Sequence, residues 1–331
     1  MAEMCVAIVI VNYRTPGLVC ACLDSLAAEQ DGDIGFHVFV GDALSGDGSV
    51  AEISAHVETC GYEWVTCFDI GANNGFATGN NAIVERHVLQ DPDFEFVHFL
   101  NPDTYIHTGA VRALVTFLKN HPAAGVVGSR LENPDGSPRA YGFRFPTPLR
   151  EFFHGARIPG LDQILPSSSV MIKNLTDRRE VDWVSGASFM VRRAVLDRVG
   201  LMDGQYFLYF EEVDFMYRIR KAGFEIWHEP ACLVVHIAGQ APGVRPDRAT
   251  QKPMPAYWFQ SRWKFFADTY GRPVAVLATV LFLAGNLLYC LHRTLRLKPI
   301  SNPPRLWQSY VRYGFSMPPR KPSKPGEPDR V

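Results

Sequence analysis

The segment Val6-Ala-Ile-Val-Ile-Val-Asn-Tyr13 decides the fold class of the chain. Its first six residues are apolar and mostly β-branched, which is typical of a strand buried on both faces of a parallel sheet. The next segment, 16–28, has apolar residues at helical spacing. A strand that leads directly into a helix is the repeating unit of α/β proteins. We therefore expect an α/β fold.

The alternation of strand and helix continues through the first third of the 331 residues. Right-handed crossovers in such a chain give a mostly parallel sheet, with its ligand site at the carboxyl ends of the strands. Tyr13, Asp42 and Asp103 each follow an expected strand, so we expect them at one edge of the sheet. The further strands and helices expected here are 37–40, 50–60, 62–68, 80–87 and 94–100.

The second half of the chain gives fewer clear signals. Glycine and proline recur over 128–182, which predicts an irregular lobe that covers the sheet. Strands are expected over 181–191 and 226–236. A helix is expected over 211–222, because acidic residues occupy its first turn, basic residues its last turn, and Gly223 follows it.

Composition excludes several classes of function. The formal net charge of −1 provides no basic field, so we expect no nucleic-acid partner. Neither a G-x-G-x-x-G nor a GxxxxGK[ST] motif is present, which disfavours dinucleotide-binding and P-loop proteins. The seven cysteines form no CxxC pair and are expected to be reduced core residues. The alternative, a metal or redox pair of Cys20 and Cys22, has no second pair to complete it.

Two residues are candidates for a metal site. Asp103 lies directly after a strand, in Asn101-Pro-Asp103, and a hard cation such as Mg²⁺ or Mn²⁺ needs few protein oxygens when phosphates complete its shell. The alternative is that Asn101 and Asp103 cap the following helix. His236 ends the last expected strand and is the second candidate ligand, although a histidine there is more often a core or rim residue.

A candidate general base lies at the start of the helix 211–222. Glu211 and Glu212 follow an aromatic run, and repulsion between neighbouring carboxylates together with lost solvation would raise at least one pKa. We choose Glu212 as the base and Glu211 as its supporting neighbour. Asp214 is expected to pair with Arg218 one turn later. The alternative is that these acids only stabilise the helix N-terminus.

A polar, glycine-bearing loop, Asn73-Asn-Gly-Phe-Ala-Thr-Gly-Asn-Asn81, opens an expected helix. Such a loop can direct backbone N–H groups at phosphate or sugar oxygens. Asn74, Gly75 and Asn81 are its candidate donor-binding residues.

The ordered set of motifs resembles the family 2 glycosyltransferases, in particular a rhamnosyltransferase-like branch that acts in cell-surface polysaccharide synthesis. The resemblance covers about residues 4–268 and is far more specific than any single motif. The motifs that carry it are Ile8-Val-Ile-Val-Asn-Tyr13, Asp42 with Ser45-Gly-Asp-Gly-Ser49, Asn74-Gly-Phe-Ala-Thr-Gly-Asn-Asn81, Leu100-Asn-Pro-Asp-Thr104, Val181-Asp-Trp-Val-Ser-Gly-Ala187, Tyr209-Phe-Glu-Glu-Val-Asp214 and Val235-His236.

The resemblance implies a GT-A fold and an inverting transfer of one sugar, a rhamnose or a hexose, from a nucleoside diphosphate. Residue by residue, it implies that Tyr13 and Asp42 contact the base and ribose of a UDP or dTDP donor. Asn101 belongs to the metal motif, where many members carry an aspartate, and Asp103 and His236 are the implied metal ligands. Glu212 is the implied base where aspartate is more usual.

The same resemblance places Trp183 and Gly186 in the pocket for the sugar and the acceptor. The acceptor it implies is a saccharide, free or linked to a lipid.

The end of the chain differs in composition. The run 274–291 is almost continuously apolar, at the lower limit of what spans a bilayer, and basic residues flank both of its ends. We expect a catalytic domain over 1–268, a membrane-associating helical segment over 269–298 and a basic, proline-rich, flexible tail over 299–331. We expect attachment to the cytoplasmic face of the inner membrane, since no secretory signal is recognisable. The alternative is that the apolar helix packs on the catalytic domain.

Two rival functions remain open. Gln260-Ser-Arg-Trp263 resembles the Q-x-x-R-W signature of processive synthases but is one residue short, and one apolar run cannot build a translocation channel. A non-catalytic nucleotide-sugar-binding or scaffold protein with the same fold is the other alternative. Asp103, Glu212 and His236 together argue against it, because a binding module needs no base.

Overall fold

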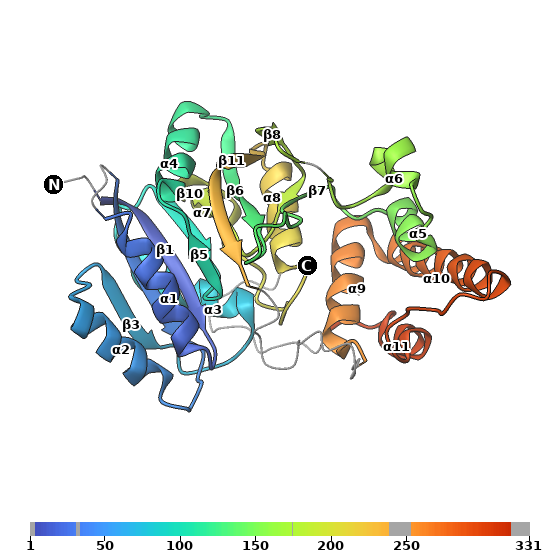
Figure 1. Cartoon of the computed structure of the whole chain (residues 1–331), viewed down its shortest axis with the longest axis horizontal. Coiled ribbons are helices and arrows are strands. Elements are labelled where there is room, and N and C mark those ends of the chain that lie inside the picture. The colour runs from blue at the N-terminus through green and yellow to red at the C-terminus, as the bar shows by residue number, and fades with distance from the viewer. Residues whose placement is uncertain (1–3, 31–33, 174, 238–252, 319–331) are drawn as a thin grey trace.

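The computed structural model describes residues 4–30, 34–173, 175–237 and 253–318. A nine-stranded mixed sheet forms its centre (Figure 1). Strands β1, β2, β3 and β4 run parallel, as do β6 and β11, while β10 is antiparallel to both β4 and β6. In spatial order the strands are β3 (Val65–Asp69), β2 (Gly35–Asp42), β1 (Met4–Asn12), β4 (Phe96–Leu100), β10 (Ser188–Arg192), β6 (Ala124–Glu132), β11 (Glu225–His236) and β5 (Thr104–Ile106), with β8 (Arg179–Glu180) beside β11.

The main hydrophobic core is formed by apolar residues of this sheet and of the helices that pack on it. Val6 to Ile10 of β1 are entirely buried, as expected for a strand covered on both faces. Figure 1 shows α1 and α2 side by side across the sheet. The helices of this part are α1 (Pro16–Ala27), α2 (Ser49–Cys60), α3 (Phe76–Ile83) continued by a π-turn (Val84–Val88), α4 (Ala110–Asn120), α7 (Arg193–Val199) and α8 (Glu211–Lys221).

Three differences from the sequence prediction have physical causes. The irregular lobe begins after Glu132 rather than at Gly128, because Gly128 lies inside β6, where a Cβ would come within 2.5 Å of Val184. The expected strand 181–191 is two strands, β9 (Trp183–Val184) and β10, separated by a turn at Ser185–Ala187 in which the Ala187 N–H donates to Ser185 Oγ. Strand β5, which the sequence does not predict, contains only three residues.

A helical module forms one side of the molecule, beyond α8 (Figure 1). A small sheet of β7 (Gly142–Phe143) and β9 lies in the segment between β6 and β10. The expected domain boundary at 268 falls inside α9, and the expected tail contains a helix, α11, packed through Leu306 and Tyr310 on Phe259. The module consists of α5 (Pro148–Ala156), α6 (Leu161–Ile164), a 3₁₀ turn (Pro166–Ser168), α9 (Ala256–Tyr270), α10 (Arg272–Leu295) and α11 (Leu306–Tyr313).

Helix α10 contains the apolar run and has two different faces. Its inner face crosses α5 so closely that a Cβ on Gly285 would lie 2.1 Å from the Phe152 carbonyl oxygen. Several leucines on its outer face are about half exposed or more. Only 39% of its most apolar 18-residue stretch is buried. By length and composition this helix could also cross a membrane. The leucines at least 48% exposed in and just after α10 are Leu277, Leu287, Leu288, Leu291, Leu295 and Leu297.

A buried ion pair fastens the module together. Arg262 of α9 is 1% exposed, and its Nε donates to Glu151 Oε2 of α5 over 2.9 Å. Its Nη1 donates to Thr279 Oγ1 of α10 over 3.0 Å. The arginine of the near-match to the processive signature therefore connects three helices, and removing one partner of such a buried pair costs roughly 3–5 kcal/mol.

Candidate active site

Asp42 organises the carboxyl ends of β1 and β2. Its Oδ2 accepts hydrogen bonds from Asn12 Nδ2 and Ser45 Oγ, both over 2.6 Å, and its Oδ1 accepts from the Ser45 N–H over 2.8 Å. The carboxylate is 2% exposed, so it fixes the loop after β2. Tyr13 lies next to this network and is partly exposed.

The structure also places Arg14 at this edge of the sheet, a residue that the sequence analysis did not identify. Arg14 adopts φ 58°, and its N–H donates to Ser45 Oγ over 2.8 Å while its Nε donates to the Ser45 carbonyl over 3.1 Å. Its guanidinium lies 5.3 Å from the centre of the Tyr13 ring. Left-handed backbone in a bulky residue is a strain that surrounding structure must hold, and such strain concentrates at functional sites. The signal in the sequence was its place directly after Tyr13.

The loop 73–81 packs against the segment that leads to Glu212. Gly75 adopts φ 95°, and a Cβ there would lie 2.0 Å from the Phe207 carbonyl oxygen, which accepts from the Phe76 N–H over 3.0 Å. Asn74 precedes this contact. Asn81 gives its Nδ2 to the Met202 carbonyl over 2.7 Å and accepts from the Met202 N–H over 3.2 Å. Its amide therefore ties α3 to the backbone of Met202, and the expected donor contact of Asn81 stays a prediction.

The structure brings Asp103 and His236 together. Strand β5 starts at Thr104 and pairs antiparallel with β11, with His236 opposite Thr104. The His236 Nε2 lies 3.2 Å from Asp103 Oδ1, and Asp103 is 9% exposed. Asn101 Oδ1 is buried and has no hydrogen-bond partner among the described residues. The paired carboxylate and imidazole are donors that fit a divalent cation, and the unsatisfied amide oxygen of Asn101 lies two residues before Asp103 in the same turn.

Glu212 lies in the first turn of α8, after a strained stretch of backbone. Tyr209 and Phe210 both adopt left-handed backbone, with φ 68° and 69°, a feature that the sequence analysis did not predict. The Glu212 Oε2 atom is buried and finds no hydrogen-bond partner in the described part of the chain. Burial raises the pKa of Glu212 to about 7. The largest cause is burial, the loss of solvation that the sequence analysis expected together with repulsion from Glu211.

The two acidic neighbours of Glu212 are also buried. Glu211 is 4% exposed at the start of α8. Asp214 forms the expected pair with Arg218, whose Nε donates to Asp214 Oδ2 over 2.9 Å. The Arg218 guanidinium also donates to the carbonyls of Val199 and Leu201, over 3.1 and 2.9 Å. The Asp214–Arg218 pair therefore anchors α8 to the loop before it.

A chain of contacts links Glu212 to the Asp103 turn. The Asn101 N–H donates to the Ala187 carbonyl over 2.9 Å. Gly186, the preceding residue, lies opposite the Glu212 side chain, since a Cβ added to Gly186 would be 3.7 Å from Glu212 Cγ. The turn between β9 and β10 thus lies between Glu212 and Asn101 of the Asp103 turn.

Glu212 also lines a pocket of about 490 Å³ between α8 and the helical module. Trp183 forms part of the wall, stacked on Phe143 with ring centres 4.0 Å apart, and its Nε1 donates to the Arg144 carbonyl over 3.0 Å. Tyr209, Phe210 and Trp258 add aromatic surface. The basic residues that line this pocket are Arg150, His154, Arg157 and Lys173.

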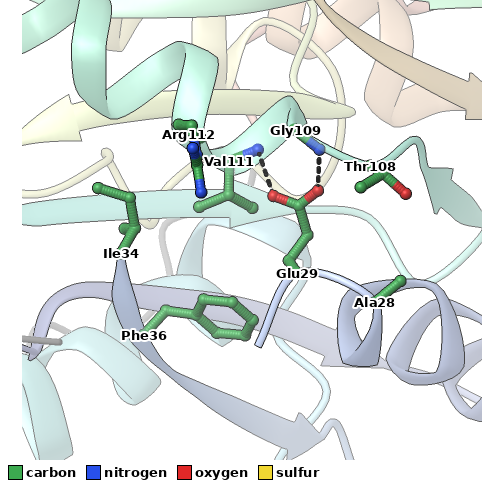
Figure 2. A pocket seen from close by; sticks show the side chains of 8 residues that line it. All are labelled: Ala28, Glu29, Ile34, Phe36, Thr108, Gly109, Val111 and Arg112. Carbon is green, nitrogen blue, oxygen red and sulfur yellow. Dashed lines mark hydrogen bonds between the residues drawn. The ribbon is translucent and has the colours of Figure 1, made fainter. Parts of the chain in front are cut away.

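A second cavity, of about 420 Å³, lies at the start of α4 and contains no comparable chemistry. Figure 2 shows the Glu29 carboxylate pointing at the N-terminus of that helix, where it accepts from the N–H groups of Gly109 and Val111. The carboxylate satisfies N–H groups that lack a partner within the helix, and its negative charge is attracted to the positive end of the helix dipole. Glu29 is therefore a capping residue.

Comparison with known proteins gives the family. The sequence model described as "Glycosyltransferase like family 2" matches residues 3–252. An N-acetylglucosaminyl-diphospho-decaprenol L-rhamnosyltransferase of Mycobacterium tuberculosis is 29% identical over 192 residues, 56% of this chain and 62% of that protein. The low-salt glycan biosynthesis hexosyltransferase Agl10 of Haloferax volcanii is 27% identical over 230 residues, 70% of this chain and 63% of that protein. The matches thus span just under two thirds of each relative.

Solved structures give the fold. GalNAc-T7 with UDP, GalNAc and Mn²⁺ superimposes with a TM-score of 0.55 at 11% identity, over 95% of this chain and 55% of that one. The mannosyltransferase PcManGT of Pyrobaculum calidifontis with GDP-Man and Mn²⁺ gives 0.53 at 15% identity, over 93% and 84%. The fold is GT-A, as the sequence predicted. The chain belongs to glycosyltransferase family 2 and resembles its rhamnosyltransferases.

Proposed function

We propose that the chain transfers a single sugar, with inversion, from a nucleoside diphosphate to a hydroxyl of an acceptor saccharide. The observation that carries this proposal is Glu212, a half-buried residue with a buried Oε2 and a pKa near 7, in the wall of a pocket large enough for a sugar. Such a group is half deprotonated at neutral pH and can accept the proton of an attacking hydroxyl. Its unpartnered Oε2 is the atom we assign to that proton.

For the donor, we assign the nucleoside to the Tyr13, Arg14 and Asp42 edge and the diphosphate to the Asp103 turn. Asp103 and His236 would hold Mg²⁺ or Mn²⁺, and we assign the unpartnered Asn101 Oδ1 to the same site. When bound, the cation would neutralise charge on the departing diphosphate. Both neighbouring structures contain Mn²⁺ and a uridine or guanosine nucleotide, and we favour UDP or dTDP for this chain on its family resemblance.

For the acceptor, we favour a saccharide carried on a lipid diphosphate. The pocket combines Glu212 with aromatic walls, which stack on sugar rings, and with cations from α5 and the following segment. Arg157 and Lys173 are exposed and could contact a phosphate. The mycobacterial relative is named for such an acceptor.

The outer face of α10 supports a membrane location. Its exposed leucines are followed by Arg293, Arg296 and Lys298, an arrangement that suits a helix lying in the plane of an anionic membrane. We propose attachment at the cytoplasmic face of the inner membrane, in cell-surface polysaccharide synthesis. The outer leucines are free for lipid because the inner face of α10 already packs on α5.

The test is a transfer assay with UDP- and dTDP-rhamnose and hexoses, Mg²⁺ or Mn²⁺, and one saccharide offered free or on a lipid diphosphate. We expect a product whose new bond is inverted relative to the donor by NMR, and a higher kcat/KM for the lipid-linked acceptor. Equal use of the free saccharide would overturn the acceptor assignment. Donor binding without any transfer would favour the scaffold alternative.

A further inference from the structure

A cluster of metal-binding side chains lies between α1 and α2, outside the candidate active site. Asp24 belongs to α1, and His56 and Cys60 lie one turn apart on α2. Residues four apart share one helix face, so His56 and Cys60 both face α1. Cys20, one turn before Asp24, occupies the same face of α1. Two helices thus present two pairs of potential ligands to each other.

The three ligand atoms already lie close together. The His56 Nε2 is 2.7 Å from Asp24 Oδ1 and 3.8 Å from Cys60 Sγ, and all three atoms lie within 4.8 Å of one another. Tetrahedral zinc with bonds of about 2.0–2.3 Å holds its ligand atoms roughly 3.3–3.8 Å apart. The contact between Asp24 and His56 would have to open by less than about 1 Å. The thiol of Cys20 lies outside this group of three and would have to move toward it.

The surroundings also suit a metal. Tyr62 donates its hydroxyl to Asp24 Oδ1 over 2.9 Å, which orients the carboxylate as outer partners of metal ligands do. Asp24 and Cys60 are exposed, which leaves a path for an ion from solvent.

We propose that Asp24, His56 and Cys60 bind one Zn²⁺, with Cys20 as the fourth ligand. Thiolate and imidazole ligands favour zinc over Mg²⁺ or Mn²⁺, so this site is distinct in chemistry from the one at Asp103. The metal would join α1 to α2. Asp24 and Cys60 lie in the last turns of these helices, so the bound ion would fasten the helix ends that are farther from the Tyr13 and Asp42 loops.

The experiment adds Co²⁺, in place of Zn²⁺, to the full-length protein with its cysteines kept reduced. Co²⁺ at Asp103 and His236 has no sulfur ligand, so a thiolate-to-cobalt charge-transfer band reports only a cysteine site. We expect the band at one Co²⁺ per chain, its displacement by Zn²⁺, its weakening in Cys60→Ser, and its loss when Cys20 and Cys60 are both replaced by serine. The matched control Cys290→Ser, in α10, should keep the band. His56→Gln, which keeps a hydrogen-bond donor beside Asp24, should weaken Co²⁺ binding at least tenfold.

Two results would overturn the proposal: no charge-transfer band in the wild type, or a band of undiminished intensity in Cys60→Ser. Unfolding gives a second measurement. Zn²⁺ should raise the thermal midpoint of the wild type and of Cys290→Ser but not of Cys60→Ser, and an equal rise in all three would assign the stabilisation to another site. Cys20→Ser tests the fourth ligand, because two thiolates give a stronger band than one.

Discussion

Replacing Glu212 by glutamine should slow transfer and stabilise the fold at the same time. Glutamine has nearly the same shape but cannot accept a proton, and positioned general bases contribute about 10²–10⁴-fold to a rate. We expect a fall of that size in kcat, with nucleotide-sugar affinity little changed. The rate of the wild type should rise with pH up to about 7 and then level off, because only the deprotonated Glu212 is active.

The effect on stability follows from the same pKa. Glu212 has a model-compound pKa of 4.5 and a folded pKa of about 7, so between these values the folded protein holds a proton that the unfolded chain has released. The wild type therefore loses stability as pH rises from 4.5 to 7 and loses no more above 7. At about 1.4 kcal/mol per tenfold change in proton affinity, the full loss is about 3 kcal/mol. Glu212→Gln avoids it.

The assay is urea unfolding of both proteins at pH 5, 6, 7 and 8, beside a nucleotide-release assay. The advantage of Glu212→Gln in free energy of unfolding should grow from pH 5 to pH 7 and then stay constant. Glu58→Gln, an exposed glutamate of α2, is the control and should change stability by no more than about 0.5 kcal/mol. An advantage that does not vary with pH would refute the burial argument, and wild-type turnover by Glu212→Gln would refute its role as base.

Two further variants probe the loop 73–81 and the outer face of α10. Gly75→Ala places a Cβ against the Phe207 carbonyl at φ 95°. We expect the free energy of unfolding to fall by roughly 1–3 kcal/mol from the backbone conformation alone, and donor binding measured by calorimetry to weaken. Unchanged donor affinity would show that this loop does not belong to the donor site. The double variant Leu288→Gln and Leu291→Gln should keep the thermal midpoint but release the protein from anionic vesicles in a flotation assay, whereas Leu44→Gln, equally exposed in the loop after β2, should float like the wild type.

The sequence predicted the parallel half of the sheet well, because its strands are buried on both faces and their composition shows it. Val6 to Ile10 is the clearest case. It did not predict that β6 runs through Gly128, since glycine in a strand weakens the apolar pattern. A side chain at position 128 would collide with Val184, which belongs to a segment far from Gly128 in the sequence. Contacts between distant segments leave no local signal of this kind.

In the candidate site, too, the residues could be predicted from local sequence, whereas contacts between distant segments could not. Asp103 and His236 were predicted to act together, but the three-residue strand β5 that brings them within 3.2 Å is too short to recognise from periodicity. Asn81 was expected to bind the donor because it lies in a polar loop, and only the structure shows its amide committed to Met202. Arg14 was missed because its left-handed backbone depends on Ser45, which folds back from another loop.

The most direct test of the central claim is donor binding by the Asp103 and His236 site. Thermal unfolding of wild type and Asp103→Asn would be followed with UDP-, dTDP- and GDP-sugars, with and without Mn²⁺. We predict stabilisation of the wild type by one nucleotide class only when Mn²⁺ is present, worth roughly 2.7 kcal/mol at a hundredfold excess over Kd, and its loss in Asp103→Asn. Stabilisation that is independent of Mn²⁺, or that persists undiminished in Asp103→Asn, would contradict the account.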